Sequence, residues 1–240
     1  MDKILDALRE ELRKNADEKT RASSQRFFKE EIKVYGIKSA QVNKISKEIF
    51  KSIKFKSNKN EDKLFIFNLA EKLWQSGYLE ESFIACNWVF SARKEFLPED
   101  FKVFENWISK YISNWASCDT FCNHTVGEFI EMYPEFIAKL KEFAKSDNPW
   151  LRRAAAVSLI IPAKKGKFLD DIFEIAEILL LDAEDLVQKG YGWLLKVASQ
   201  SHQKEVFDFV IKHKAIMPRT ALRYAIEKMP KELKVQAMAK

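Results

Sequence analysis

The sequence predicts an all-α fold in which short helices pack as antiparallel pairs and stack into an α-solenoid. Apolar residues recur at three- and four-residue spacing in successive windows along the chain, which is the pattern of amphipathic helices. No window alternates apolar and polar residues as a half-buried strand would. Only a few residues connect one window to the next, so consecutive helices should pack antiparallel.

Prolines mark the starts of several of these helices. Five of the six stand where an amphipathic pattern begins, in "LPEDF", "YPEFI", "NPWLR", "MPRTA" and "MPKEL". Proline suits the first helical turn because its missing N–H would be unpaired there. In chain order, the predicted helices span residues 2–14, 20–34, 39–54, 62–76, 79–93, 99–114, 119–131, 134–145, 149–161, 168–181, 185–200, 203–213, 218–228 and 231–239.

The helix pairs favour HEAT-like or ARM-like repeats over a compact bundle, because no long central helix is expected. The letters themselves carry no strict period. The basic, polar segment 54–63, "KFKSNKNEDK", is the clearest loop. We interpret it as a connection inside a single domain that spans residues 1–240.

Composition narrows the class of protein. The chain has 240 residues, is 47% hydrophobic and contains no apolar run that approaches the roughly 20 residues of a membrane span. Its N-terminus mixes acids and bases, unlike a secretory signal, so we expect a soluble, cytoplasmic protein with no membrane partner. The three cysteines (Cys86, Cys118 and Cys122) are expected to be free thiols. A formal charge of +6 favours polyanionic partners.

Arg153 stands at an unusual position in "NPWLRRAAAVSLI". On a helical wheel it shares the apolar face of Trp150, Val157 and Ile160, whereas Arg152 lies about a quarter turn away. A guanidinium on that face is costly unless it meets an anion, either a carboxylate of the protein or a phosphate of a ligand. The other interpretation is an arginine that snorkels from the edge of the stripe.

The segment "EDLVQKGYGWLLKVAS", residues 184–199, predicts a helix with a tryptophan at the border of its apolar stripe. Leu186, Gly190, Leu194 and Val197 form its core side, and Trp193 is flanked by Lys189, Gly192 and Lys196. An aromatic ring between lysines, next to glycines that let a ligand approach, suits a nucleic-acid surface. A half-buried tryptophan with solvated neighbours explains the same pattern.

The stretch "NWASCDTFCN", residues 114–123, concentrates chemically active side chains. Asp119 is expected to cap a helix that begins at Thr120, and Trp115 can belong to the core. Cys118, Cys122 and His124 have poor spacing for zinc and no obvious fourth ligand, so we expect no metal. Neither His124 nor the other histidines have a nucleophile motif around them.

Taken in order, these stretches resemble the AlkD-type DNA alkylation repair family, which comprises alkylpurine DNA glycosylases built from HEAT-like repeats. The resemblance depends on the Trp-x-x-x-Asp spacing of "WASCD", on "NPWLRRAA" and on "VQKGYGW", with a weaker similarity in "RFFKEEIKVYGIKSAQ". It implies that Asp119 is the catalytic carboxylate, that Trp115 and Trp193 are cleft tryptophans, and that Arg153 is the cleft arginine. Ala116, Ser117 and Cys118 depart from the family pattern, in which an aromatic or acidic residue often precedes the carboxylate.

The resemblance further implies a monofunctional enzyme that releases N3- or N7-alkylated purines from duplex DNA on a concave surface, without a base-flipping pocket. An alkylated purine is already cationic and departs neutral, so one carboxylate can stabilise the oxocarbenium-like sugar and orient water. We expect a monomer without cofactors, with further phosphate contacts at Lys189, Lys196, Arg219 and Arg223. The alternatives are a non-catalytic repeat module that binds damaged or branched DNA, and a protein scaffold.

Overall fold

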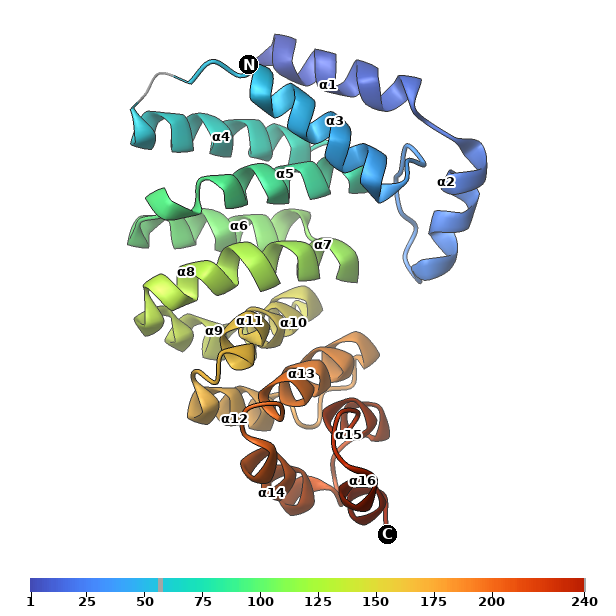
Figure 1. The fold of residues 1–240 in the computed structure, drawn as a ribbon, viewed down its shortest axis with the longest axis vertical. Coiled ribbons are helices and arrows are strands. Elements are labelled where there is room, and N and C mark those ends of the chain that lie inside the picture. Colours follow the sequence, from blue (N-terminus) through green and yellow to red (C-terminus); the bar gives the residue numbers. More distant parts are fainter. Residues whose placement is uncertain (56–57, 240) are drawn as a thin grey trace. The chain divides into compact units, whose positions relative to one another are not determined.

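The regular secondary structure of the part that the computed structural model describes, residues 1–55 and 58–239, is helical (Figure 1). These residues contain no β-strand, and their one isolated bridge pairs Lys33 with Tyr78. The chain divides into two compact units, unit 1 (Met1–Phe121) and unit 2 (Cys122–Lys240). The predicted all-α class is therefore confirmed for the described residues.

Unit 1 is a stack of helices in which each packs on its neighbours. Its α-helices are α1 (Asp2–Lys14), α2 (Glu18–Ser24), α3 (Ser39–Ser52), α4 (Lys59–Trp74), α5 (Leu79–Ser91), α6 (Phe101–Tyr111) and α7 (Trp115–Thr120). Helix α5 packs against α3, α4 and α7, and α4 also packs against α6. Figure 1 shows α4, α5 and α6 as successive layers of this stack. Its interior is aromatic, with Trp74, Phe104, Trp107 and Phe121 almost fully buried.

Unit 2 is organised around one buried helix. It contains α8 (Gly127–Met132), α9 (Ile137–Phe143), α10 (Pro149–Val157), α11 (Ile160–Lys164), α12 (Leu169–Ile178), α13 (Asp185–Ala198), α14 (Gln203–His213), α15 (Arg219–Ala225) and α16 (Lys231–Met238). Helix α13 packs against α10, α11, α12 and α15. Eight of its residues are buried, so it is the central element of this unit.

The predicted proline starts are confirmed. Pro149 is the first residue of α10, and Pro218 and Pro230 directly precede α15 and α16. Pro98 and Pro134 begin short 3₁₀ turns that lead into α6 and α9. These helix starts could be predicted from the sequence because proline affects only the helical turn in which it stands.

The predicted helix over residues 20–34 is wrong. Helix α2 ends at Ser24, a 3₁₀ turn follows at Gln25–Phe27, and residues 28–38 are not helical. Within the predicted range, the Ile32 N–H donates to Gln25 Oε1 at 3.1 Å and the Lys33 carbonyl accepts the N–H of Leu79 at 2.9 Å, so neither group takes part in a helical ladder. A buried carboxylate on a distant helix binds the residues that follow. Glu80 of α5 accepts the backbone N–H groups of Tyr35, Gly36 and Ile37 at 3.1, 2.9 and 3.2 Å, so these groups are unavailable to a helical ladder.

Two further predicted boundaries need correction. Helix α4 begins at Lys59, inside the predicted loop 54–63, because the Asn58 side chain caps it by accepting the N–H of Glu61. Residues 56 and 57 of that loop lie outside the described residues. The predicted helix 149–161 is interrupted after Val157, and the chain resumes as α11 at Ile160.

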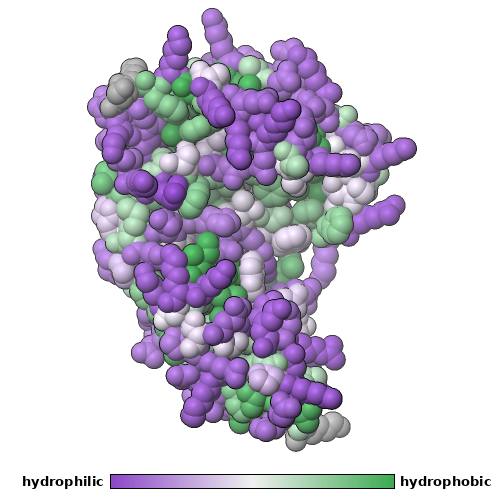
Figure 2. All heavy atoms as spheres, in the orientation of Figure 1, coloured by the Kyte–Doolittle hydropathy of each residue, from purple (hydrophilic) through white to green (hydrophobic). Residues whose placement is uncertain are grey.

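The face of the protein in Figure 2 is mainly hydrophilic, and the cysteines are in the interior. On the face drawn in Figure 2, hydrophilic side chains predominate and apolar side chains show in small groups between them. Among the described residues, no helix combines the length and the apolar character that a membrane span requires. All three cysteines are free and buried.

Candidate active site

Asp119 and Trp115 lie one turn apart on α7. Both side chains are half-buried, whereas Ala116, Ser117 and Cys118 between them are buried. The Trp-x-x-x-Asp spacing therefore brings the ring and the carboxylate to the same partly open face of one helix. The local arrangement is rigid, since a short helix with three buried residues cannot rotate without exposing them.

The expectation that Asp119 caps a helix at Thr120 is wrong. Helix α7 begins four residues before Asp119, and its N-cap is Asn114, whose side-chain oxygen accepts the N–H of Ser117 at 2.9 Å. Asn is as good an N-cap as Asp, and the signal was present in the sequence. Asp119 consequently lies inside the helix, where capping does not explain it.

Trp115 is held by the segment that follows α2. Its indole Nε1 donates to the carbonyl of Phe27 at 3.2 Å, and its ring stacks on Phe28 with centroids 5.5 Å apart and planes 19° from parallel. The same rings pack on a small core that includes Val34 and Leu79. The indole orientation is thus determined by contacts on its edge and on its face.

Phe27 is a candidate site residue that the sequence interpretation missed. Its side chain is 73% exposed, although it is apolar and its carbonyl binds Trp115. The available signal was the pair of phenylalanines in "RFFKEE", which the sequence interpretation assigned to an ordinary helix. The exposed ring of Phe27 is thus carried by the same residue whose backbone carbonyl holds the Trp115 indole.

The backbone of this segment depends on Gly36. Its φ of +86° is unfavourable for other residues, and a Cβ there would lie 2.4 Å from the carbonyl oxygen of Asp17. With the three N–H groups bound by Glu80, the glycine turn fixes the chain that carries Phe28 to Trp115. The sequence gave no indication of the partner on α5.

Arg153 is buried in unit 2, with 5% of its surface exposed, so the snorkelling interpretation is wrong. Its guanidinium donates from Nη1 to the carbonyl oxygen of Leu186, in the first turn of α13. Gly190 lies beside it, and a Cβ at this glycine would be in ordinary contact, at 3.5 Å, with both Cγ and Nη1 of Arg153. The helical wheel correctly indicated that Arg153 lies on the buried face of its helix. The guanidinium lies between α10 and α13.

The neighbouring Arg152 has a structural partner. Its Nε and Nη2 donate to the two carboxylate oxygens of Asp182 at 2.6 and 3.3 Å, and its Nη1 donates to the carbonyl of Ser146 at 2.9 Å. This bidentate pair ties α10 to the turn before α13. The two adjacent arginines therefore have separate surroundings.

On α13, Trp193 is half-buried at the border of the apolar stripe, and its lysine neighbours are ion-paired. Lys189 meets Asp185 at 2.6 Å, and Lys196 meets Glu227 at 3.0 Å. The expectation that Gly192 opens the backbone to a ligand is wrong. A Cβ at Gly192 would lie 2.7 Å from Tyr224 Cβ and 2.8 Å from the Ala221 oxygen, so this glycine permits close packing of α15.

Arg219 and Arg223 lie one turn apart on α15, and both are exposed. Neither side chain has an ion pair within residues 1–55 and 58–239. The structure thus brings Trp115, Asp119, Phe27 and Phe28 together in unit 1. In unit 2 it gathers Arg153, Lys189, Trp193 and Lys196 on α10 and α13, with the two arginines on the adjoining α15.

Comparison with known proteins supplies the family. The family model described as DNA alkylation repair enzyme matches residues 8–229. Among solved structures, the chain is similar to one described as a predicted DNA alkylation repair enzyme from Enterococcus faecalis. Their TM-score is 0.77 at 18% sequence identity, and the match covers 90% of this chain and 98% of that chain, which shows a shared fold. No curated protein gives a match. Since the family model spans most of both units, the chain belongs to the DNA alkylation repair enzyme family.

Proposed function

We propose that the protein is a monofunctional DNA glycosylase that hydrolyses the N-glycosidic bond of N3- and N7-alkylated purines in duplex DNA. The observation that carries the proposal is the pairing of Asp119 with Trp115 on one half-exposed face of α7. Trp115 is held there by Phe27 and Phe28. Family membership supports an alkylation-repair role.

The chemistry requires few groups. Alkylation at N3 or N7 makes the purine cationic, so it leaves as a neutral base and needs no proton from the enzyme. The remaining requirement is stabilisation of a sugar with oxocarbenium character, and one carboxylate can supply it while orienting the attacking water. We assign both roles to Asp119.

The aromatic surroundings suit a cationic sugar. The negative face of an indole ring attracts positive charge, and apolar rings keep bulk water from the carboxylate, which strengthens its field. We assign this role to Trp115 and, in unit 2, to Trp193. Arg153 is proposed as a phosphate contact, because the family resemblance implies a cleft arginine at this position and a guanidinium matches phosphate oxygens well.

The four other residues proposed to contact DNA differ in whether their charges are already paired within the protein. Arg219 and Arg223 are exposed and have no ion pair among the described residues, which suits phosphate binding. Lys189 and Lys196 would first have to leave Asp185 and Glu227. We also propose that the helix pairs form a HEAT-like solenoid over residues 1–240, whose concave surface binds the duplex of a monomeric enzyme without flipping the base.

Base release from methylated duplex DNA tests the proposal. Free 3-methyladenine and 7-methylguanine would be quantified by chromatography for the wild type, Asp119→Asn and the control Asp6→Asn, which changes an exposed carboxylate on α1. We expect the wild type and the control to release bases. Asp119→Asn should lose activity by about 10²-fold or more while still binding DNA, since the removed group acts mainly in the transition state.

The other outcomes are equally informative. Equal release by Asp119→Asn would show that a different residue supplies the negative charge. DNA binding without release of any alkylated base by the wild type would replace the enzyme with a binding module.

A further inference from the structure

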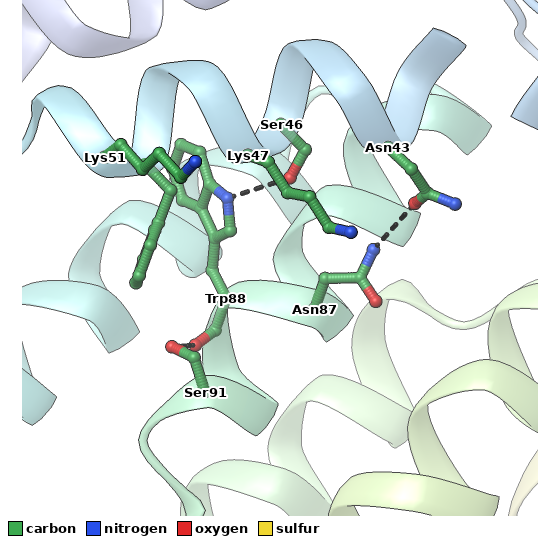
Figure 3. A pocket seen from close by; sticks show the side chains of 8 residues that line it. Asn43, Ser46, Lys47, Lys51, Asn87, Trp88 and Ser91 are labelled. Atoms are coloured by element: carbon green, nitrogen blue, oxygen red, sulfur yellow. Dashed lines mark hydrogen bonds between the residues drawn. The ribbon is translucent and has the colours of Figure 1, made fainter. Parts of the chain in front are cut away.

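A groove in unit 1, between α3 and α5, has the composition of an anion site. It has a volume of about 460 Å³ and is lined by Asn43, Ser46, Lys47, Phe50, Lys51, Asn87, Trp88 and Ser91. We call it the α3–α5 groove. Figure 3 shows both lysines on the side of α3 that faces Asn87 and Trp88 of α5. None of the groove's lining residues carries a carboxylate, so its formal charge is positive.

Three other grooves of unit 1 differ from it in the charges of their lining residues. One includes Glu31, another Glu61 and Asp62, and a third Asp62 and Glu95. Each of these therefore mixes acids with its bases. The excess of positive charge in the α3–α5 groove is not a general property of the surface hollows of this basic chain.

Lys47 and Lys51 have no ion-pair partner among the described residues. Several lysines of unit 1 are ion-paired, namely Lys14, Lys59, Lys63 and Lys72. Lys47 and Lys51 are exposed, one turn apart, and have no ion pair within the described part of the chain. Glu48, which lies beside Lys47 in the sequence, pairs with neither of them. Both ammonium groups are thus available to an external anion.

The back of the groove strengthens its attraction for anions. Trp88 is 2% exposed and its Nε1 donates to Ser46 Oγ at 3.0 Å, so the indole is fixed. Phe50 packs on it with ring centroids 5.5 Å apart. An apolar wall of low polarisability behind two cations reduces solvent screening on that side and strengthens their field.

Side-chain amides also line the groove. Asn87 Nδ2 donates to Asn43 Oδ1 at 3.2 Å, which links α5 to α3 at one end of the groove (Figure 3). The lining therefore combines two lysines with two side-chain amides. Lysines with amide donors are a common arrangement for binding phosphate oxygens.

We propose that the α3–α5 groove binds phosphates of the DNA backbone, as a contact in unit 1 separate from α7. The ligand class depends on the proposed function, since duplex DNA is the polyanion that such an enzyme would meet. The spacing of Lys47 and Lys51 by one helical turn suits two neighbouring phosphates or both sides of one. Chemistry at Asp119 does not require this groove.

The test is the salt dependence of duplex binding by the full-length protein, measured by fluorescence anisotropy. Each phosphate neutralised by a lysine contributes about 0.9 to the slope of log K against log [salt]. For Lys47→Ala/Lys51→Ala we expect the slope to decrease by about 2, and affinity at ~0.1 M salt to fall about tenfold or more. Asn43→Ala/Asn87→Ala should weaken binding at an unchanged slope.

Matched controls separate the groove from net charge. Lys3→Ala/Lys102→Ala removes two exposed, unpaired lysines of α1 and α6, and should leave the slope nearly unchanged. Lys47→Arg/Lys51→Arg should retain the wild-type slope. An unchanged slope in the Lys47/Lys51 alanine variant, or an equal decrease in the Lys3/Lys102 control, would overturn the proposal. Duplex binding that responds as expected without any base release would uphold the groove and reject the glycosylase.

Discussion

At the scale of single residues, Gly190 and Gly192 show how two nearly opposite faces of one helix contact different neighbours. Both lie on α13, two positions apart. A Cβ at Gly190 would be in ordinary contact with Arg153 and Val157 at 3.5 to 3.7 Å, whereas a Cβ at Gly192 would overlap Tyr224 and the backbone of Ala221. The first glycine lies against a side chain, and the second lies against another helix.

Alanine substitutions should separate these two roles. Gly190→Ala should leave the free energy of unfolding unchanged or raise it by up to about 1 kcal/mol, because alanine favours the helix. Gly192→Ala should lower it by about 1–3 kcal/mol, since α15 must move away. Urea denaturation of both variants measures the difference. Equal stabilities would contradict the close α13–α15 packing.

The candidate site residues also illustrate what a helical wheel can and cannot detect. The wheel identified Arg153 as unusual and Trp193 as a border residue, because both depend only on spacing along one helix. It could not identify the Leu186 carbonyl as a partner of Arg153, nor Phe27 and Phe28 as neighbours of Trp115. Those contacts join residues far apart in the chain.

At the scale of elements, the non-helical segment 28–38 is the main departure from the expected fold. Two adjacent buried carboxylates of α5 hold it. Glu80 binds three backbone N–H groups, and Glu81 accepts from the Tyr35 hydroxyl at 2.7 Å and pairs with Arg9 at 2.9 Å. These contacts hold the segment that carries Phe28 against Trp115. The two buried carboxylates of α5 therefore help to position a residue of the candidate site.

Removing the charge of Glu80 should loosen this segment. Glu80→Gln replaces one acceptor with an NH₂ group that opposes a backbone N–H, which should cost about 1–3 kcal/mol of stability. Hydrogen exchange of the Tyr35, Gly36 and Ile37 amides should accelerate relative to the α5 core. Glu48→Gln, an exposed change on α3, should have no such effect. Unchanged protection of the three amides in Glu80→Gln would argue against Glu80 as their anchor.

At the scale of the whole molecule, charges set how stability depends on pH. Hydrogen bonds with cations or polar groups lower the pKa of several carboxyls, namely Asp2, Glu10, Asp17, Glu177 and Glu227. Burial by itself would raise the pKa of Glu71, but hydrogen bonds from Tyr111, Trp107 and Gln75 outweigh it and lower that pKa. Burial raises the pKa of Tyr35, Cys86 and Tyr191.

The direction of each shift predicts the pH profile of unfolding. Lowered carboxyl pKa values add stability above the unfolded values of 3.8 for Asp and 4.5 for Glu, and this stability is lost as pH falls through the folded values. Raised Tyr and Cys pKa values favour the native state at neutral pH, and that stability is lost as pH rises beyond the unfolded values.

Thermal unfolding should therefore show a Tm plateau between about pH 5 and 9, with declines on both sides. Glu71→Gln should lower the plateau and make the acid decline shallower, whereas Glu48→Gln should leave both unchanged. An acid limb of equal steepness in the Glu71 variant would remove Glu71 from this explanation.

The sequence by itself determined the all-α class and most helix positions, because proline starts, caps and apolar periodicity act within a few residues. The Trp-x-x-x-Asp spacing of Trp115 and Asp119 was significant only through the family resemblance, because the predicted helices ended at residue 114 and began again at 119. The α7 cap at Asn114 was local as well, and choosing Asp119 instead was an error of interpretation rather than a missing signal.

Only the tertiary structure decided the conformation of residues 28–38, the partner of Arg153, the packing role of Gly192 and the pairing of Lys196 with Glu227. The physical reason is the same for most of them. A buried carboxylate, a carbonyl or a neighbouring helix supplied from 30 or more positions away outweighs local helix propensity and assigns each polar group its partner. Such partners become visible only when the helices are packed.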